Sequence, residues 1–583
     1  MLSLAFKRLR FIALCITTAQ AVSDFDWQTL TPSPGLDWKP CYSGFQCTRL
    51  TVPLDYSAPQ GSNASIAIVR LPSTAPKSEY RGPILFNPGG PGGSGVDAIV
   101  ENGEAFVNTF GPGFDIVGFD PRGISYSTPI ISFFNTEAER RFLIPSATNI
   151  IYPSLNQSSH ALSEGWADYQ LLGQLALASD VGAGHYLQHM STDNIARDML
   201  RITEVFGFEK LQYWGISYGS VLGATFATMF PVCGHLKLLK SKLSGCCHIH
   251  PFRSFNRLTS ISQSANGTSM MADVDGSLDA FFDGCHKAGP ELCPFYEPTA
   301  SAISAKLDAL TASVHEKPIA VVTPGSHGLI DLTFLRNVIL DALFDPYDSA
   351  SGFVPLAQGL AHLAKGNATA LYALGAIPTF ECPASASAAP AFHENNLEAY
   401  IAIACGDANP VNDTLTELQE YWLNGLRVSN FSDLLSSPRV VCSGYNIHRP
   451  GRFQGPVGAK NISFPLLLVG NTLDPGTAHA GAIQTSKAFP GSVVLTQDSV
   501  GHTSLVAPSS CKDGYFREYF VNGTLPAPGT VCPIDIELFP NSTSPDASAT
   551  TKRALQTVEE KRLLNAGRKI GRVVRRAVGR RAL

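Results

Sequence analysis

Five short apolar runs along the chain have the length and the β-branched or aromatic content of strands buried in a parallel sheet. Each is followed by a turn rich in Gly, Asp or Asn, and they cover residues 83–86, 114–119, 211–214, 465–469 and 492–495. A helical pattern precedes the third run, with Thr192 as the expected N-cap and Gly207 as the end. This alternation predicts an α/β fold with a mostly parallel sheet and helices on both faces.

The strand pattern disappears between about residues 231 and 455. Helical stretches alternate there with loops rich in Pro, Ala and Ser, at residues 276–287, 302–314 and 415–422. A long helical segment between two parts of one sheet predicts a large, mainly helical lid inserted into the sheet domain.

Composition supports a globular protein with an acidic body. Of the 583 residues 44% are hydrophobic and 16% charged, enough for a large core with an elaborate insertion. The net charge is -5 although the tail from Lys552 onward carries eleven Lys and Arg, so the remainder is acidic and nucleic acid is not an expected partner. We expect the basic tail, after a Ser/Thr/Ala linker at 541–551, to be solvated or cleaved. The alternative is reversible contact with an anionic surface.

The N-terminus has the pattern of a secretory signal peptide. A basic region at residues 7–10 precedes an apolar run at 11–19, and Ala19-Gln20-Ala21 forms a small-residue cleavage site. The apolar run is too short for a bilayer core of about 30 Å, and no other stretch approaches about 18 uninterrupted apolar residues. We therefore expect a secreted protein without a spanning segment.

Glycosylation and cysteine patterns agree with export. Nine Asn-X-Ser/Thr sequons predict a glycosylated surface, at Asn63, Asn156, Asn266, Asn367, Asn412, Asn430, Asn461, Asn522 and Asn541. Twelve cysteines remain after signal removal, and close spacing suggests the pairs Cys41/Cys47, Cys285/Cys293 and Cys511/Cys532, with Cys405/Cys442 as a looser candidate. Metal-ligand spacing is absent, so we expect disulfides and neither a metal nor a cofactor.

The candidate nucleophile is Ser217, in Gly215-Ile216-Ser217-Tyr218-Gly219. A G-x-S-x-G match alone is weak, but this one follows a predicted strand and opens a helix of small residues. That context predicts a strained elbow exposing the serine hydroxyl, rather than an ordinary tight turn. The helix N-terminus adds partial positive charge where an oxyanion would form.

Two backbone N–H groups are expected to form the oxyanion hole. One belongs to Tyr218, and the other to Gly90 in the glycine-rich loop 87–95 after the first predicted strand. A phosphate-cradling loop is the rival interpretation, but no Gly-Lys-Ser/Thr follows. Ser94 is also flanked by glycine, yet no strand directly precedes it, so we interpret it as a loop residue.

The base and the orienting acid should follow late strands. Asp474 follows the run 465–469 and His502 follows the run 492–495, so both suit loops at the carboxyl edge of the sheet. The rivals fit less well: Asp407 lies in the lid, Asp498 precedes the histidine loop and His479 falls on the expected next helix.

Together these motifs resemble one family. They are residues 87–95, 119–123, 213–219, 474–475 and 501–502, with an N-terminal extension at 38–56, a lid segment at 402–407 and a C-terminal segment at 511–532. The chain resembles the secreted prolyl-aminopeptidase and tripeptidyl-aminopeptidase family of α/β-hydrolases over most of residues 36–535. The resemblance implies serine peptidase chemistry at a free peptide N-terminus, with an unassigned acidic lid residue holding the substrate ammonium.

One segment departs from the family pattern. After the nucleophile helix the family continues into a core strand ending in Asp-Gly, whereas residues 232–263 here contain no Asp or Glu but several Cys, Lys and Arg. We interpret this stretch as translated intron or mis-joined exon sequence. The alternative is an authentic lineage-specific loop, in which case a core strand would be missing.

The expected organisation is a signal peptide (1–21), an N-terminal extension (22–77), a first core half with the nucleophile (78–231), a lid (232–455), a second core half with acid and histidine (456–540), and a linker with the basic tail (541–583). The leading function is an aminopeptidase that releases N-terminal proline or short peptides. The alternatives are an esterase or metabolite-tailoring hydrolase acting on a small molecule, and an inactive secreted binding protein.

Overall fold

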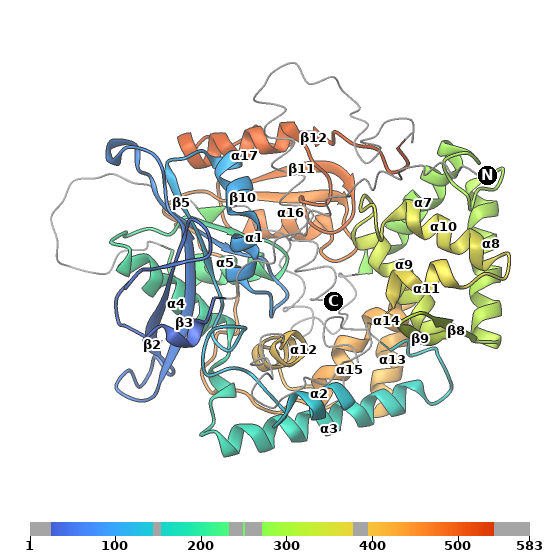
Figure 1. The fold of residues 1–583 in the computed structure, drawn as a ribbon, viewed down its shortest axis with the longest axis horizontal. Helices are drawn as coiled ribbons and strands as arrows, with labels where there is room; N and C mark the ends of the chain where they lie inside the picture. The colour runs from blue at the N-terminus through green and yellow to red at the C-terminus, as the bar shows by residue number, and fades with distance from the viewer. Residues whose placement is uncertain (1–24, 144–152, 232–248, 251–270, 377–394, 541–583) are drawn as a thin grey trace, which may run out of the picture.

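The computed structural model describes residues 25–143, 153–231, 249–250, 271–376 and 395–540. Its first sheet begins with antiparallel strands (Figure 1). A meander of three strands opens it, formed by β1 (Lys39–Cys41), β2 (Phe45–Pro53) and β3 (Asn63–Leu71). Strand β3 pairs antiparallel with β5 (Phe114–Phe119), so the N-terminal extension forms one side of the sheet rather than a separate unit.

The central and C-terminal strands are parallel. Strand β4 (Gly82–Asn87) lies between β5 and β6 (Tyr213–Gly215), and β6 pairs with the two-residue strand β7 (Ile249–His250). A second sheet contains β10 (Leu467–Leu473), β11 (Val493–Val500) and β12 (Val531–Pro533). Strand β7 is at the edge of the first sheet and also contacts β10, so it lies at the side of the first sheet that faces the second one.

The five strand predictions are confirmed. The run 114–119 coincides with β5, and the others overlap β4, β6, β10 and β11 within a few residues at each end. The helix α4 (Thr192–Val205) differs in its first turn, because Ser191 is the N-cap and Thr192 is already helical.

Helices cover both faces of the sheet. On one face, α1 (Gly95–Phe110) and α17 (Ser510–Asn522) lie over a core that includes Phe86 and Trp214. On the other, α4 and α5 (Tyr218–Met229) lie over a core that includes Leu85. Neighbouring residues of β4 therefore contribute to opposite cores, as the period-two geometry of a strand requires.

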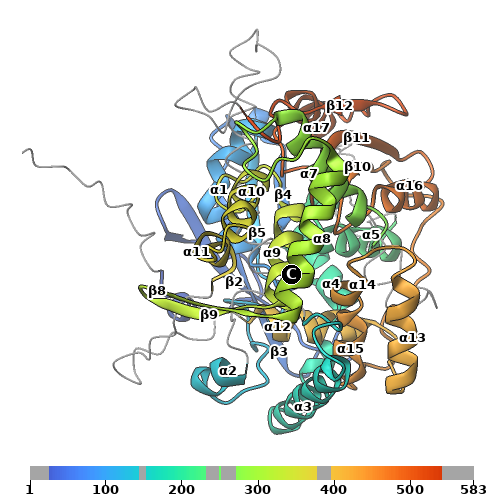
Figure 2. The same ribbon diagram turned by 90° about the vertical axis from the view of Figure 1, so that its right-hand side faces the viewer.

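The segment expected to form the lid, called the lid below, occupies the chain between α5 and β10, on the right and lower side of Figure 1. Its described helices are α7 (Val274–Ala288), α8 (Ala300–Glu316), α9 (Leu332–Phe344), α10 (Phe353–Leu363), α11 (Thr369–Gly375), α12 (Asn396–Tyr400), α13 (Leu415–Gly425), α14 (Ser432–Leu435) and α15 (Ser437–Ser443). A π-helical turn (Ile401–Cys405) follows α12. The lid also contains the hairpin β8 (Ile319–Thr323) and β9 (Ser326–Ile330), visible at the lower left of Figure 2, which the sequence analysis did not anticipate.

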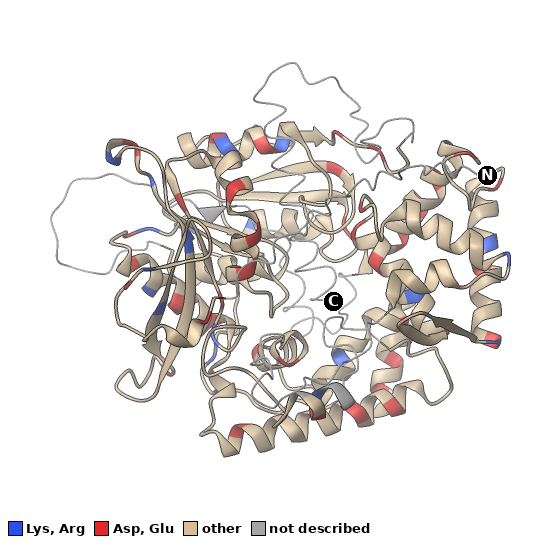
Figure 3. Ribbon diagram, viewed as in Figure 1, with Lys and Arg blue, Asp and Glu red and all other residues tan. Residues whose placement is uncertain are grey.

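Helices from the first core half extend the lid. Helix α2 (Glu137–Leu143) and the long α3 (Ala161–Gly182) precede α4 in the chain, yet α3 packs against α13 and α15. The contact between α3 and the end of α15 needs glycine, since a Cβ on Gly173 would lie 1.7 Å from the carbonyl oxygen of Gly444. All the charged residues of α3 are acidic (red in Figure 3).

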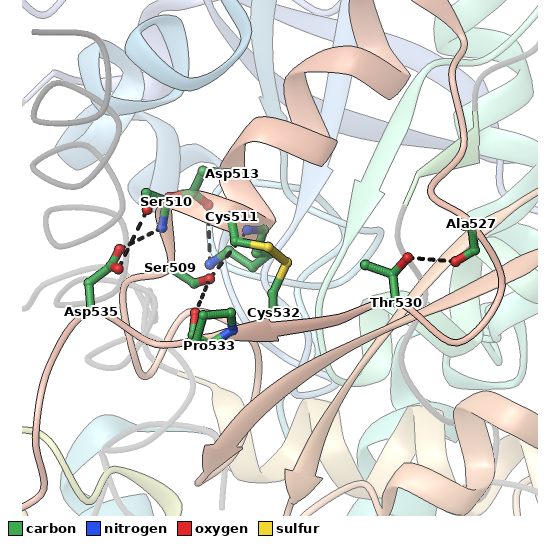
Figure 4. The surroundings of a disulfide bond; sticks show 10 residues. Ser509, Ser510, Cys511, Asp513, Ala527, Thr530, Cys532, Pro533 and Asp535 are labelled. Atoms are coloured by element: carbon green, nitrogen blue, oxygen red, sulfur yellow. Dashed lines mark hydrogen bonds and ion pairs between the residues drawn. A yellow bond between two sulfur atoms is a disulfide. The ribbon is translucent and has the colours of Figure 1, made fainter. Parts of the chain in front are cut away.

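Four disulfides join the pairs that sequence spacing suggested: Cys41–Cys47, Cys285–Cys293, Cys405–Cys442 and Cys511–Cys532. The last one attaches β12 to α17 (Figure 4). Beside it, Ser509 Oγ donates to the Pro533 carbonyl at 2.7 Å and the Ser510 amide donates to Asp535 Oδ2 at 2.6 Å, so the C-terminal segment is anchored at several points.

Within the described ranges, no helix is both long and apolar enough to cross a membrane. The expected signal peptide, the basic tail, Asn266, Asn541 and most of the atypical segment 232–263 lie outside the described residues.

Candidate active site

Ser217 occupies a sharp turn between β6 and α5. Its backbone has φ 53° and ψ -122°, a combination that costs free energy for a residue with a side chain. The flanking glycines allow the close packing: a Cβ on Gly215 would lie 2.2 Å from the Gly219 carbonyl oxygen, and one on Gly219 would lie 2.7 Å from that of Asn87. These contacts explain why the motif has glycine on both sides of the serine.

Three residues from distant parts of the chain form a hydrogen-bonded series. The Nε2 atom of His502 lies 3.0 Å from Ser217 Oγ, and its Nδ1 atom lies 2.8 Å from Asp474 Oδ1. All three side chains are buried, with Ser217 only 1% exposed. Burial strengthens the hydrogen bonds and restricts competing water.

The Asp474 carboxylate is held by backbone N–H groups. Oδ1 accepts from Gly476 at 3.0 Å and Thr477 at 2.9 Å, while Oδ2 accepts from Thr503 at 3.1 Å. These bonds hold the carboxylate in the orientation in which Oδ1 also contacts His502.

Asp273 at the start of α7 supports the same loop, a role that no motif around this residue indicates. Its Oδ2 atom accepts from the backbone amides of Asp474 at 3.3 Å and His479 at 3.0 Å. Burial raises the pKa of Asp273, the two amide bonds lower it, and the nearby Asp474 charge raises it further. A lid residue 201 positions earlier in the chain thus fixes the acid loop.

The histidine loop is fixed from the core and from the lid. Asn471 Nδ2 donates to the carbonyls of Gly501 at 2.6 Å and Thr503 at 3.0 Å. The His502 amide donates to the Phe344 carbonyl at the end of α9, and the Phe344 ring packs edge-on against the imidazole, 5.0 Å between centroids. The lid therefore contacts the proposed base directly.

The glycine-rich loop lies directly beside the elbow. A Cβ on Gly89 would lie 2.5 Å from the Ile216 carbonyl oxygen, and Gly90 has φ +110°, so neither position suits a side chain. The Gly89 amide donates to Asn87 Oδ1 at 3.0 Å. Within the described part of the chain, no acceptor is bonded to the amide of Gly90 or Tyr218, the two donors expected from the sequence.

The rival residues have other partners. Ser94 caps α1 and donates to Asp120 at 2.6 Å, and burial raises the pKa of Asp120 to about 7. His479 contacts Thr496 through Nε2 at 3.0 Å, and Asp498 accepts from Thr472 at 3.0 Å. The other rival, the lid residue Asp407, is bonded to the Thr192 amide. The described residues contain no group of His, Cys, Asp or Glu arranged to hold a metal.

A strained serine after a sheet strand, hydrogen-bonded to a histidine and a carboxylate from later strands, defines a serine hydrolase with the α/β-hydrolase fold. Comparison with family models agrees with this class. Residues 82–251 match the model described as alpha/beta hydrolase fold, and residues 428–532 match the one described as TAP-like protein. The two matches contain the elbow and the acid and histidine loops, respectively.

Relatives that align with most of the chain indicate which proteins of this class it is similar to. The chain is 27% identical to a tripeptidyl aminopeptidase of Streptomyces lividans, over 85% of this chain and 86% of the relative. It is 27% identical to serine protease Hip1 of Mycobacterium bovis, over 85% and 91%. It is also 26% identical to carboxylesterase B of Mycobacterium tuberculosis, over 84% and 86%. The chain thus resembles the tripeptidyl-aminopeptidase-like hydrolases over most of its length.

Proposed function

We propose that this chain is an aminopeptidase that releases N-terminal proline or short peptides through an acyl-enzyme on Ser217. The observation that carries the proposal is the series from Ser217 Oγ through His502 to Asp474, with distances of 3.0 and 2.8 Å. The peptidase relatives support a peptide as the substrate.

In this mechanism His502 Nε2 removes the proton from Ser217 Oγ as that oxygen attacks the scissile carbonyl. Asp474 holds the imidazole by Nδ1 and stabilises its positive charge. The amides of Gly90 and Tyr218 stabilise the oxyanion. The tetrahedral intermediate collapses with cleavage of the C–N bond, and His502 protonates the departing amine. Water, activated by the same histidine, then releases the N-terminal fragment and restores the serine.

Burial of the nucleophile supports action at chain ends. Ser217 is 1% exposed and His502 is 4% exposed, and α12 of the lid lies close to the oxyanion loop, since a Cβ on Gly92 would be 3.0 Å from the Asn396 carbonyl oxygen. A narrow free end enters such a covered site more readily than an internal loop of a folded protein.

Peptides with free and blocked N-termini test this assignment. The enzyme should cleave free-amine peptide p-nitroanilides and reject their acetylated counterparts. Ser217→Ala should abolish both hydrolysis and labelling by a fluorophosphonate probe without lowering the melting temperature. Equal cleavage of free and blocked peptides would overturn the aminopeptidase assignment.

An esterase is the second candidate, because one of the relatives is a carboxylesterase and the same site attacks esters. Comparison of kcat/KM for an ester and a peptide with the same acyl group separates the two functions. A peptide rate more than about 1000-fold below the ester rate would favour the esterase. An unlabelled but folded wild-type protein would indicate the inactive homologue.

We also propose that the protein is secreted and glycosylated. All seven sequon asparagines in the described ranges are exposed: Asn63, Asn156, Asn367, Asn412, Asn430, Asn461 and Asn522. The four disulfides fit an oxidising compartment. Export should yield a protein that shifts to lower mass on treatment with an N-glycosidase. Recovery only inside cells, with no mass shift, would contradict the proposal.

A further inference from the structure

The N-terminus of α4 is capped by a residue from the lid rather than by its own N-cap side chain. Ser191 occupies the N-cap position, but its hydroxyl donates to Asp193 Oδ1 at 2.5 Å. The amide of Thr192, the first helical residue, instead donates to both carboxylate oxygens of Asp407, at 3.1 and 3.2 Å. Asp407 follows the π-helical turn of the lid, 215 positions later in the chain.

The same threonine connects this cap to the oxyanion side of the elbow. Its hydroxyl lies 2.7 Å from the hydroxyl of Tyr218, while its backbone amide is the group that donates to the Asp407 carboxylate. Either hydroxyl of the Thr192–Tyr218 pair can be the donor, since each has one O–H and two acceptor lone pairs. Tyr218 is only 2% exposed, so its side chain and its backbone amide cannot move independently over more than a short distance.

Both negatively and positively charged groups lie near Asp407. On α4, Asp193 faces it and is itself paired with Arg197 and Arg449. Arg452, after α15, donates to the carbonyls of Asp407 at 3.4 Å and Ala408 at 2.8 Å.

Together these surroundings make the Asp407 carboxyl group more readily protonated at neutral pH than an ordinary carboxyl group. Burial is the main cause that raises the pKa of Asp407 to about 7, and the charge of Asp193 adds to it. The bonds from Thr192 and the charge of Arg452 act in the opposite direction. The hydroxyl of Tyr445 is a further titratable group near Asp407, and the charge of Asp407 helps to raise the pKa of Tyr445.

We propose that Asp407 is a positioning residue that links the seating of the lid to the oxyanion hole through Thr192 and Tyr218. The proposal rests on the function assigned above, because it takes the Tyr218 amide as an oxyanion donor. With Asp407 ionised, both carboxylate oxygens accept from the Thr192 amide and hold this residue in place. When Asp407 is protonated, one of its oxygens carries the proton and accepts more weakly from the Thr192 amide. Thr192 and the Tyr218 hydroxyl bonded to it are then held less firmly, and the Tyr218 amide with them.

The kinetic consequence is a loss in kcat rather than in KM. Complete loss of an oxyanion donor costs about 100- to 1000-fold, so loosening one of two donors should cost about 10-fold. The effect should extend to a fluorophosphonate, whose phosphoryl oxygen uses the same donors but which has no ammonium group. Activity should fall with decreasing pH through about 7 as Asp407 takes up a proton, in addition to the fall caused by protonation of the base.

The test measures phosphonylation rates and peptide kcat and KM across pH 5–9. We expect Asp407→Asn and Thr192→Val each to slow phosphonylation about 10-fold, and the double variant to be no slower than either one. Thr192→Ser keeps the hydroxyl and should react at the wild-type rate. Asp413→Asn is a matched control, since Asp413 is a lid carboxylate paired with Arg439 at 2.5 Å and lies outside this series. The pH profile of Asp407→Asn should lose one ionisation.

Two results would overturn the proposal. The first is phosphonylation of Asp407→Asn within twofold of wild type with a raised KM for free-amine peptides, which would make Asp407 a binding site for the substrate ammonium. The second is equal rates for Thr192→Val and Thr192→Ser, a pair that decides the question even if Asp407→Asn does not fold. A wild type that reacts with the probe but cleaves no peptide would refute the peptidase function and leave this test intact.

Discussion

Gly476 provides a direct test of how closely the imidazole must be held. A Cβ at this position would lie 2.6 Å from His502 Nδ1 and 2.7 Å from a ring carbon of Phe344. Ordinary contact distances are about 3.5 Å, so Gly476→Ala should displace the imidazole by about 1 Å. The φ of Gly476 lies outside the left-handed region, so the substitution adds a steric contact without backbone strain.

The displacement should reduce kcat about 100-fold and leave KM nearly unchanged. A misplacement of about 1 Å in a catalytic group costs roughly that factor, equivalent to about 2.7 kcal/mol of activation free energy. The starting geometry leaves little tolerance, because His502 already has hydrogen bonds of 2.8 and 3.0 Å on its two nitrogens. The assay is steady-state hydrolysis of a peptide p-nitroanilide, with phosphonylation as a second measure of serine reactivity.

A second glycine is the matched control. Gly514 lies within α17, where an added Cβ would meet nothing within 4 Å. Gly514→Ala should therefore keep kcat and stabilise the helix by about 0.5–1 kcal/mol. The reasoning fails if Gly476→Ala retains kcat within threefold of wild type, or if its loss of activity only follows a loss of folded protein.

Removing the carboxylate of Asp273 by Asp273→Ala should lower kcat about 10-fold through a looser Asp474 loop, because two partly buried backbone amides lose their acceptor; an unchanged kcat would show that the loop is rigid without it. Replacing both cysteines of the Cys511–Cys532 disulfide by serine opens a 21-residue loop and should lower the free energy of unfolding in urea by about 3 kcal/mol, whereas a change under about 1 kcal/mol would contradict this. Asp120 has its pKa raised by burial to about 7, so its contribution to stability is greatest below its unfolded pKa and is lost as pH rises to about 7. Relative to wild type, Asp120→Asn should therefore gain stability between pH 4 and 7 by on the order of 4 kcal/mol in denaturant titrations, and a pH-independent difference would refute the assignment.

Local patterns were sufficient to predict the strands and the elbow. Strand β5 coincides with the predicted run because a central parallel strand is apolar on both faces and ends at polar turns. Ser217 could be identified because the elbow geometry needs glycine at fixed positions around it. These features depend on residues close together in the sequence, so one chain is enough to reveal them.

Supporting residues could not be predicted in this way. Asp273 and Asp407 are hydrogen-bonded to partners 201 and 215 positions away. Asp407 ends the lid segment 402–407 that resembles the family, but neither local sequence indicates the distant partner. Asp407 also replaced the local cap expected at Thr192, a tertiary contact that overrides local propensity. The lid hairpin is a different case, because the Pro324-Gly325 turn between two short apolar stretches is a sequence signal for a hairpin.

The distance along the chain between the proposed nucleophile and the proposed base has a consequence for synthesis. His502 follows Ser217 by 285 residues, so at roughly 5–20 residues per second the ribosome needs about 15–60 seconds to add the base after the serine. The acid is also made late, just 28 residues before the histidine. During that interval the nascent chain carries a serine that no partner can activate, so the polypeptide remains inert toward its surroundings until its second half has been completed and folded.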